Sequence, residues 1–337
     1  MTSLGNDRLA EEGKLTTDDC AIVTQGLTRR FGSTVAVNGL DLCVRRGEVF
    51  GLLGPDGAGK TTTIHMLCGL MTPSQGSARV AGFDTAGQPE PIKHRIGYMA
   101  QRFNLYGDLS VVENLDFFAD VFRVHGAERR ERRARLLEFA GLVEFQKRRA
   151  AHLSGGMQKK LALACTLIHR PEIVFLDEPT TGVDPVSRRE FWNILTELHL
   201  QGVTILVSTP YMDEAERCSR VALLYEGQIV VCDRPDRIKA LVSGELLEVR
   251  TSDLRRAEEV AAGLEGVLEV QTYGDLLHIF VDSAIERQEF VRGALSSAGV
   301  AVLGLRQTRP RMEEAFISLV RKQMGITSSR VGRGSLG

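Results

Sequence analysis

The stretch Gly54–Thr61 (GPDGAGKT) constrains this chain more than any other, because it has the spacing G-x-x-x-x-G-K-[ST] of a loop that wraps phosphate groups. The apolar run Val49–Leu53 before it predicts a buried strand, and Thr61–Leu70 after it predicts a helix whose positive N-terminal end faces the loop. Backbone N–H groups of such a loop bind phosphate oxygens, and its glycines allow an approach that a Cβ would block. We therefore predict a binding site for a nucleoside triphosphate.

The residues around this loop have separate expected tasks. Lys60 is expected to be a surface-facing loop charge that reaches the outer phosphates, and the Thr61 hydroxyl suits a Mg²⁺ ion. Phe31 precedes a predicted turn and either stacks on a purine ring or packs at a strand edge; the local sequence leaves both interpretations open. The predicted nucleotide contacts are Phe31, Gly54, Pro55, Asp56, Gly57, Ala58, Gly59, Lys60, Thr61 and Thr62.

Composition limits the setting of this site. The 337 residues are 43% apolar and 25% charged, which indicates a globular chain with room for about two domains. A formal net charge of -1 gives no sign of a nucleic-acid footprint, and no nucleic-acid partner is expected. No apolar run approaches the length needed to cross a bilayer, so a membrane role is expected to need a partner. The cysteines are expected to be reduced cytosolic thiols: Cys20, Cys43, Cys68, Cys165, Cys218 and Cys232.

Two later stretches also suit phosphate chemistry. In Leu153–Met157 (LSGGM), Ser154 can cap a helix and the glycines after it leave N–H groups exposed, which predicts a second anion-binding helix end. The continuous apolar run Ile173–Leu176 predicts a buried strand that carries Asp177 and Glu178 at its carboxyl end. Beside a phosphate loop, one such carboxylate can assist Mg²⁺ and the next can act on water.

In this order, the motifs resemble those of ATP-binding cassette (ABC) ATPases, and the resemblance covers about residues 21–235. The matching segments are Gly54–Thr61 for the Walker A motif, Gln101 for the Q-loop glutamine, Leu153–Met157 for the signature motif, Ile173–Pro179 (IVFLDEP) for the Walker B motif with its following glutamate, and Val183-Asp184 for the D-loop.

The resemblance implies ATP and Mg²⁺ as ligands and assigns roles to these residues. Glu178 and Gln101 would be catalytic, and Mg²⁺ would be bound by Thr61, Gln101 and Asp177. Cassettes of this family dimerise head to tail, and the signature of one closes on the phosphates held by the other. Since the chain has one copy of each motif, it is expected to need a second cassette, as a homodimer. The signature residues expected to act across the dimer are Leu153, Ser154, Gly155, Gly156 and Met157.

Two residues depart from the family pattern. Asp56 stands where asparagine is usual, and a mild effect is expected because backbone N–H groups make most of the phosphate contacts. Pro210 stands where a switch histidine is most often found, and proline has neither a side-chain donor nor an N–H group to offer the γ-phosphate. The neighbouring Tyr211 could substitute in part.

The expected fold class is α/β: a P-loop NTPase cassette with an antiparallel β subdomain and a helical subdomain, plus a small C-terminal α+β domain. A βαββαβ order of predicted elements after Gly244 favours a ferredoxin-like sandwich for that domain. The expected division is a disordered lead at 1–19, an ABC nucleotide-binding domain at 20–243 with its helical subdomain at about 102–170, the accessory domain with a terminal helix at 244–322, and a disordered tail at 323–337.

The segments Arg311–Phe316 (RMEEAF) and Thr209–Glu216 (TPYMDEAE) further resemble cassettes that energise type-2 ABC exporters, including drug-efflux ATPases. This resemblance implies a peripheral subunit on the cytoplasmic face of the inner membrane, docked on a separate integral-membrane permease through the helical region after Gln101. Two other functions are open: an ATP-gated dimerising module with little hydrolysis, and a soluble ribosome-associated cassette. The second is disfavoured because the chain has neither a second cassette nor a strongly basic arm.

Overall fold

The computed structural model describes residues 19–102 and 105–324, and the predicted disordered lead and tail lie almost wholly outside them. The chain divides into two compact units, one up to Asp233 and one from Arg234. No helix within the described residues is long and apolar enough to span a membrane.

A six-stranded sheet of order β10-β9-β3-β8-β7-β6 forms the centre of the first unit. Its neighbours from β9 to β6 are parallel, and only β10 pairs antiparallel. Every residue of β3, β7 and β8 is buried, which explains the apolar runs Val49–Leu53, Ile173–Leu176 and 205–207 in these strands. The strands are β3 (Val49–Leu53), β6 (Ile96–Met99), β7 (Ile173–Asp177), β8 (Thr204–Thr209), β9 (Arg220–Tyr225) and β10 (Gln228–Asp233).

An antiparallel sheet of order β2-β1-β4-β5 forms the predicted β subdomain. It consists of β1 (Cys20–Phe31), β2 (Thr34–Arg45), β4 (Gln75–Val80) and β5 (Phe83–Asp84). Its apolar residues share one core with β3 and with the helix after the phosphate loop. The loop is thus held between the two sheets.

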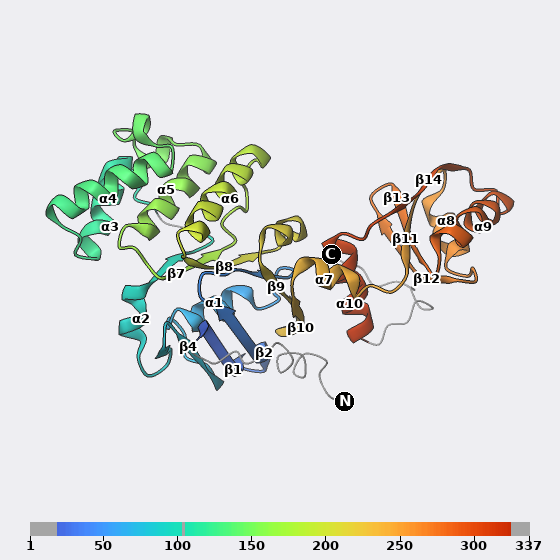
Figure 1. The fold of residues 1–337 in the computed structure, drawn as a ribbon, viewed down its shortest axis with the longest axis horizontal. Coiled ribbons are helices and arrows are strands. Elements are labelled where there is room, and N and C mark those ends of the chain that lie inside the picture. The colour runs from blue at the N-terminus through green and yellow to red at the C-terminus, as the bar shows by residue number, and fades with distance from the viewer. Residues whose placement is uncertain (1–18, 103–104, 325–337) are drawn as a thin grey trace. The chain divides into compact units, whose positions relative to one another are not determined.

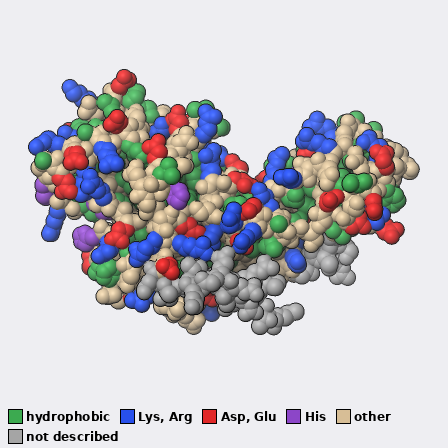
Figure 2. Space-filling model, viewed as in Figure 1, with side chains coloured by type: hydrophobic (Ala, Val, Ile, Leu, Met, Phe, Trp, Pro, Cys, Tyr) green, Lys and Arg blue, Asp and Glu red, His purple; other side chains and the backbone are tan. Residues whose placement is uncertain are grey.

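The helices of the first unit include the predicted helical subdomain, and α3, α4 and α5 lie together in Figure 1. A capping box at Ser110 begins α3, and Ser154 caps α5. Arg129, Arg132 and Arg133 of α4 form ion pairs with nearby carboxylates, and Figure 2 shows basic and acidic side chains interspersed there. The elements are α1 (Lys60–Leu67), α2 (Pro89–Arg95), α3 (Val111–Val121), α4 (Gly126–Phe139), α5 (Gly155–Leu167), α6 (Pro185–Leu200) and the 3₁₀ turns η2 (Val143–Phe145), η3 (Ala150–His152) and η4 (Met212–Arg217).

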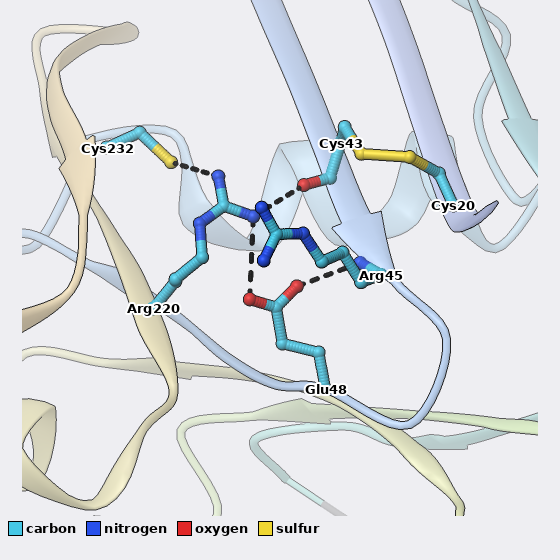
Figure 3. The surroundings of a disulfide bond; sticks show 6 residues. All are labelled: Cys20, Cys43, Arg45, Glu48, Arg220 and Cys232. Atoms are coloured by element: carbon cyan, nitrogen blue, oxygen red, sulfur yellow. Dashed lines mark hydrogen bonds and ion pairs between the residues drawn. A yellow bond between two sulfur atoms is a disulfide. The ribbon is translucent and has the colours of Figure 1, made fainter. Parts of the chain in front are cut away.

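Cys20 of β1 and Cys43 of β2 form a disulfide, with their Cα atoms 5.8 Å apart (Figure 3). The expectation that all the cysteines are reduced thiols is therefore wrong for this pair. The antiparallel pairing of β1 with β2 brings together two side chains that are 23 residues apart in sequence. Nearby, Arg220 of β9 donates to the Cys43 carbonyl oxygen over 3.2 Å and lies 3.4 Å from a Glu48 carboxylate oxygen, so it connects the two sheets.

The second unit contains a four-stranded antiparallel sheet of order β12-β13-β11-β14. Helices α8 and α9 share one apolar core with the sheet, and this βαββαβ arrangement is the expected ferredoxin-like sandwich. The elements are α7 (Pro235–Ala240), β11 (Glu245–Thr251), α8 (Leu254–Ala261), β12 (Val267–Tyr273), β13 (Leu276–Val281), α9 (Ala284–Ser297), β14 (Val302–Thr308) and α10 (Met312–Gln323).

A row of polar side chains, one from each strand, crosses this second sheet: Gln271, His278, Glu248 and Arg306 are successive register partners. Arg306 Nη2 lies 2.6 Å from Glu248 Oε1, and His278 Nε2 lies 3.7 Å from Glu248 Oε2. On the other side of the imidazole, Nδ1 lies 3.1 Å from Oε1 of Glu314, a buried residue of α10. The row therefore connects the terminal helix to the sheet through polar contacts. Burial raises the pKa of Glu314, but hydrogen bonds from His278 and the Arg311 N–H outweigh it, and the pKa is lowered below its usual value.

A carboxyl whose pKa is lowered in the folded state stabilises that state above its unfolded-state pKa of about 4.3, and the contribution is lost as the pH falls through the folded-state pKa. Glu314→Gln is therefore expected to lower the free energy of unfolding by about 1 to 3 kcal/mol at neutral pH, and this difference should shrink below about pH 4. Chemical denaturation of the full chain at several pH values measures it. Glu313→Gln, at an exposed neighbour, is the control, and a difference independent of pH would contradict the prediction.

Candidate functional site

The phosphate loop connects β3 to α1 and packs closely against two other backbones. Gly57 and Gly59 have φ angles of 78° and 102°, a conformation that favours glycine. A Cβ at Gly59 would collide with the Ala36 carbonyl oxygen, and one at Gly54 would collide with that of Leu224. These glycines are therefore required by the loop itself, before any ligand is considered.

Lys60 is buried, contrary to the expectation of a surface-facing side chain. Only 4% of it is exposed, and Nζ donates to the carbonyl oxygens of Gly54 and Pro55 over 2.9 and 3.0 Å. Nζ also lies 3.1 Å from Oε1 of Glu178. The lysine is buried because the loop wraps around its ammonium group and a carboxylate neutralises it.

The start of α1 is suited to an anion. Its N-cap, Gly59, provides no side-chain hydrogen bond, and the first turn carries no acidic residue, so no side chain competes for its first N–H groups. Thr61 is exposed and Thr62 is half-buried at this end. Pro55 and Asp56 are exposed on the loop before them, whereas Ala58 is buried.

The two predicted carboxylates lie at the carboxyl end of β7, and both are buried. Gln101, which follows β6, donates from Nε2 to Glu178 Oε2 over 2.8 Å. The other oxygen of this carboxylate contacts Lys60. The structure thus brings together Lys60, Gln101 and Glu178, three residues that the sequence singled out in separate segments.

The signature segment begins α5 as the sequence predicted. The Ser154 hydroxyl accepts a hydrogen bond from the Met157 N–H over 3.3 Å, and both Ser154 and Gly155 are exposed. Leu153 is buried in the core of the helical subdomain. Gly156 is buried, and a Cβ there would collide with Ser187 of α6, whereas Gly155 has open space around it. One glycine serves packing and the other leaves the helix end accessible.

Phe31 ends β1 and is 45% exposed. The Arg29 guanidinium lies 4.8 Å from the centre of its ring, and Arg29 is itself held by the Thr72 carbonyl oxygen over 2.7 Å. Phe31 is therefore not packed as a core residue. A stacking role toward a base is still a prediction.

Sequence reasoning missed two residues that contact the site. Ser208 donates to the Asp177 carboxylate over 2.6 Å, and Lys159 Nζ donates to the Gln101 carbonyl oxygen over 2.9 Å. Both contacts depend on neighbours from distant segments, which no local pattern reveals. By contrast, the ring of Tyr211, beside Pro210, is covered by the Arg188 guanidinium 4.4 Å from its centre, so it packs on α6.

The donor set fits Mg²⁺ only in part. Asp177 and Thr61 offer the hard oxygen ligands that Mg²⁺ prefers. No group of three or more His, Cys, Asp or Glu side chains that could hold a metal occurs in residues 19–102 and 105–324. An ion at this site would therefore take its remaining ligands from water and from the phosphates of a nucleotide.

The sequence matches the family described as ABC transporter over residues 37–181. A probable multidrug ABC transporter ATP-binding protein, YbhF of Escherichia coli, is 44% identical over 225 residues, 67% of this chain and 39% of that protein. The chain thus spans about two fifths of the YbhF proteins that it matches. The daunorubicin resistance ATP-binding protein DrrA2 of Streptomyces coeruleorubidus is 36% identical over 307 residues, 90% of this chain and 95% of DrrA2. Among solved structures, cbiO1 from Clostridium perfringens, part of an ABC transporter complex, has a TM-score of 0.62 and 27% identity, covering 66% of this chain and 92% of that one.

Lys60→Ala is expected to abolish ATP binding and to lower the free energy of unfolding by about 3 to 5 kcal/mol, because it leaves the buried Glu178 carboxylate without its cation. A fluorescent ATP analogue and chemical denaturation measure the two effects. The double variant Lys60→Ala/Glu178→Gln should recover most of the stability but no ATP binding. Tight ATP binding by Lys60→Ala would contradict the assignment of the phosphate loop.

Proposed function

Because the chain belongs to the family of ABC transporter ATP-binding subunits, we propose that it binds and hydrolyses ATP to energise export through a separate ABC-2 type membrane permease. The observation that carries this proposal is the contact of Lys60 and Gln101 with the two oxygens of Glu178, directly beside the phosphate loop.

Nucleotide binding uses the loop and the start of α1. The N–H groups of Gly57 to Thr62 bind the phosphates, and Phe31 stacks on the adenine. Lys60 exchanges its contact with Glu178 for one with the outer phosphates, so that the arriving charge of ATP replaces the charge of the carboxylate. Asp177, Thr61 and Gln101 would hold Mg²⁺, which would neutralise charge on the phosphates.

Hydrolysis uses Glu178, which is free to act once Lys60 turns to the phosphates. Its carboxylate polarises the attacking water and accepts its proton, and Gln101 keeps the carboxylate oriented through its 2.8 Å hydrogen bond. Burial of Glu178 limits the access of bulk water to this group.

A second copy of the chain completes the site. Ser154 and Gly155 are exposed at the start of α5, and within the described ranges no hydrogen bond or ion pair joins them to the phosphate loop. An exposed helix N-terminus of this kind can bind the γ-phosphate held by a partner. A solved cassette, MJ0796, is described as a dimer, with 26% identity and a TM-score of 0.58, which supports a homodimer.

The permease docks on the helical subdomain, as a peripheral contact on the cytoplasmic face of the inner membrane. Tyr106, Phe117 and Val121 are exposed there, and the rings of Tyr106 and Phe117 lie 4.5 Å apart. An exposed aromatic and aliphatic cluster suits a protein partner. Export is supported by the names of two relatives, a daunorubicin resistance protein and a Nod factor export protein, each about 36% identical.

A second candidate is an ATP-gated dimer with little hydrolysis. It is favoured by Pro210, which has no donor for the γ-phosphate, and by the packing of the Tyr211 ring against Arg188. In this case ATP closes the dimer and the closed state itself drives the permease.

Glu178→Gln is expected to bind ATP, to form a long-lived dimer and to hydrolyse about 10²- to 10⁴-fold more slowly, because the amide cannot act as a base. Pro210→His should change the rate less and in the direction of faster hydrolysis, since it adds a donor near the γ-phosphate. Single-turnover hydrolysis with dimer lifetime separates these effects. A near-parental rate in Glu178→Gln would exclude this carboxylate as the base.

Ser154→Arg is expected to bind ATP but not to hydrolyse it, because the arginine blocks the surface that closes on the partner's nucleotide. Lys60→Ala is expected to be inactive for a different reason, namely that it does not bind ATP. Mixing the two variants should restore turnover, since one composite site then pairs an intact Lys60 with an intact Ser154. Normal turnover by Ser154→Arg alone, or no recovery on mixing, would oppose action across the dimer.

A further inference from the structure

The carboxyl end of β8 carries a buried contact to the candidate metal ligand. Ser208 is the register partner of Asp177 in the parallel pair β7 and β8, and both residues are almost fully buried. Partners in a sheet project from the same face, so the two side chains meet. The Ser208 hydroxyl donates to Asp177 Oδ1 over 2.6 Å.

The same hydroxyl contacts the next residue of the chain. The Glu178 N–H is shared between Oγ and the carbonyl oxygen of Ser208, each 3.1 Å away. Since a serine hydroxyl has one proton, accepting from Glu178 leaves that proton for Asp177. Glu178 also has a φ of 47°, a left-handed conformation that is uncommon for a residue with a Cβ and that outside contacts must hold.

We propose that Ser208 is a positioning residue for both carboxylates: it orients Asp177 toward the Mg²⁺ of bound ATP and holds the turn that places Glu178. The proposal rests on the proposed function in one respect, the binding of that ion by Asp177. In this role Ser208 acts through the two carboxylates and not through a contact of its own with the nucleotide. Although Pro210, two residues later, offers no hydrogen-bond donor, β8 still contributes to the site through this hydroxyl.

The hydrogen bond from Ser208 matters because its acceptor, Asp177, is a buried carboxylate. Within the described residues, the side chain of Asp177 accepts a hydrogen bond at Oδ1 only, so Oδ2 is available to a cation. A hydrogen bond to a charged group contributes more than one between neutral groups, and the loss of a partner from a buried carboxylate is costly. Removing the hydroxyl therefore frees the carboxylate to rotate and weakens its hold on the ion.

The test compares four variants of the full-length chain. Ser208→Ala removes the hydroxyl. Ser208→Thr and Ser208→Val introduce side chains of nearly equal volume, and only threonine keeps the hydroxyl. Thr204→Val is the matched control, because its buried hydroxyl lies at the other end of β8 and accepts from the Gly47 N–H, away from both carboxylates. Two readouts are taken: the Mg²⁺ concentration for half-maximal ATP hydrolysis, and Mn²⁺ binding by electron paramagnetic resonance with a non-hydrolysable ATP analogue.

Ser208→Ala and Ser208→Val are expected to need about tenfold more metal in both readouts, the equivalent of one hydrogen bond to a charged group. ATP-analogue binding without metal should stay unchanged, and Ser208→Thr should behave as the parent. If Ser208→Val does not fold, the comparison of Ser208→Ala with Thr204→Val gives the same answer. Unchanged metal dependence in Ser208→Ala, or an equal change in Thr204→Val, would overturn the proposal.

These measurements distinguish a failure of the proposed ATP hydrolysis from a failure of the proposed role of Ser208. If the parent chain does not hydrolyse ATP but Ser208→Ala still weakens Mn²⁺ binding, the proposed hydrolysis is wrong and the role of Ser208 stands. If the parent hydrolyses ATP and Ser208→Ala binds metal as tightly as the parent does, the role of Ser208 is wrong and the proposed function stands.

Discussion

The buried ion pair between Lys60 and Glu178 is the interaction on which the site depends. Each charge would be costly to bury alone, and the 3.1 Å contact makes both tolerable. Such a pair rarely adds much net stability over apolar packing. Its importance is that another anion can take the place of the carboxylate beside Lys60. Under the proposed function, the phosphates of ATP offer Lys60 another anion, and the Glu178 carboxylate is then free to act on water.

This pair forms because a parallel sheet collects the carboxyl ends of its strands at one edge. β3 leads into the phosphate loop, β7 into the carboxylates and β6 into Gln101, and β8 lies between β3 and β7. The antiparallel sheet restrains the loop from the other side, where only glycine fits at position 59 against Ala36 of β2. Gly54 meets the same limit against Leu224 of β9, in the six-stranded sheet. Arg220 connects the two sheets beside the disulfide (Figure 3).

The second unit uses charge in a different way. One face of its sheet contributes to an apolar core with α8 and α9. The polar row includes His278, which lies between the carboxylates of Glu248 and Glu314, one from the sheet and one from α10. Both imidazole nitrogens therefore face carboxylate oxygens. Directional contacts of this kind specify where a short terminal helix docks, which apolar packing alone does less sharply.

Local sequence determined much of this protein. The phosphate loop, the Ser154 cap, the buried strand before Asp177 and Glu178, and the ferredoxin-like order all follow from spacing and periodicity, because each depends on neighbours within a few residues. Tertiary structure alone decided the rest: the burial of Lys60, the contact of Ser208 with Asp177 and the pairing of Cys20 with Cys43. Each of these joins residues from different strands or loops, and its distance is set by sheet order and register. Local patterns do not encode that order, because it results from the packing of the whole unit.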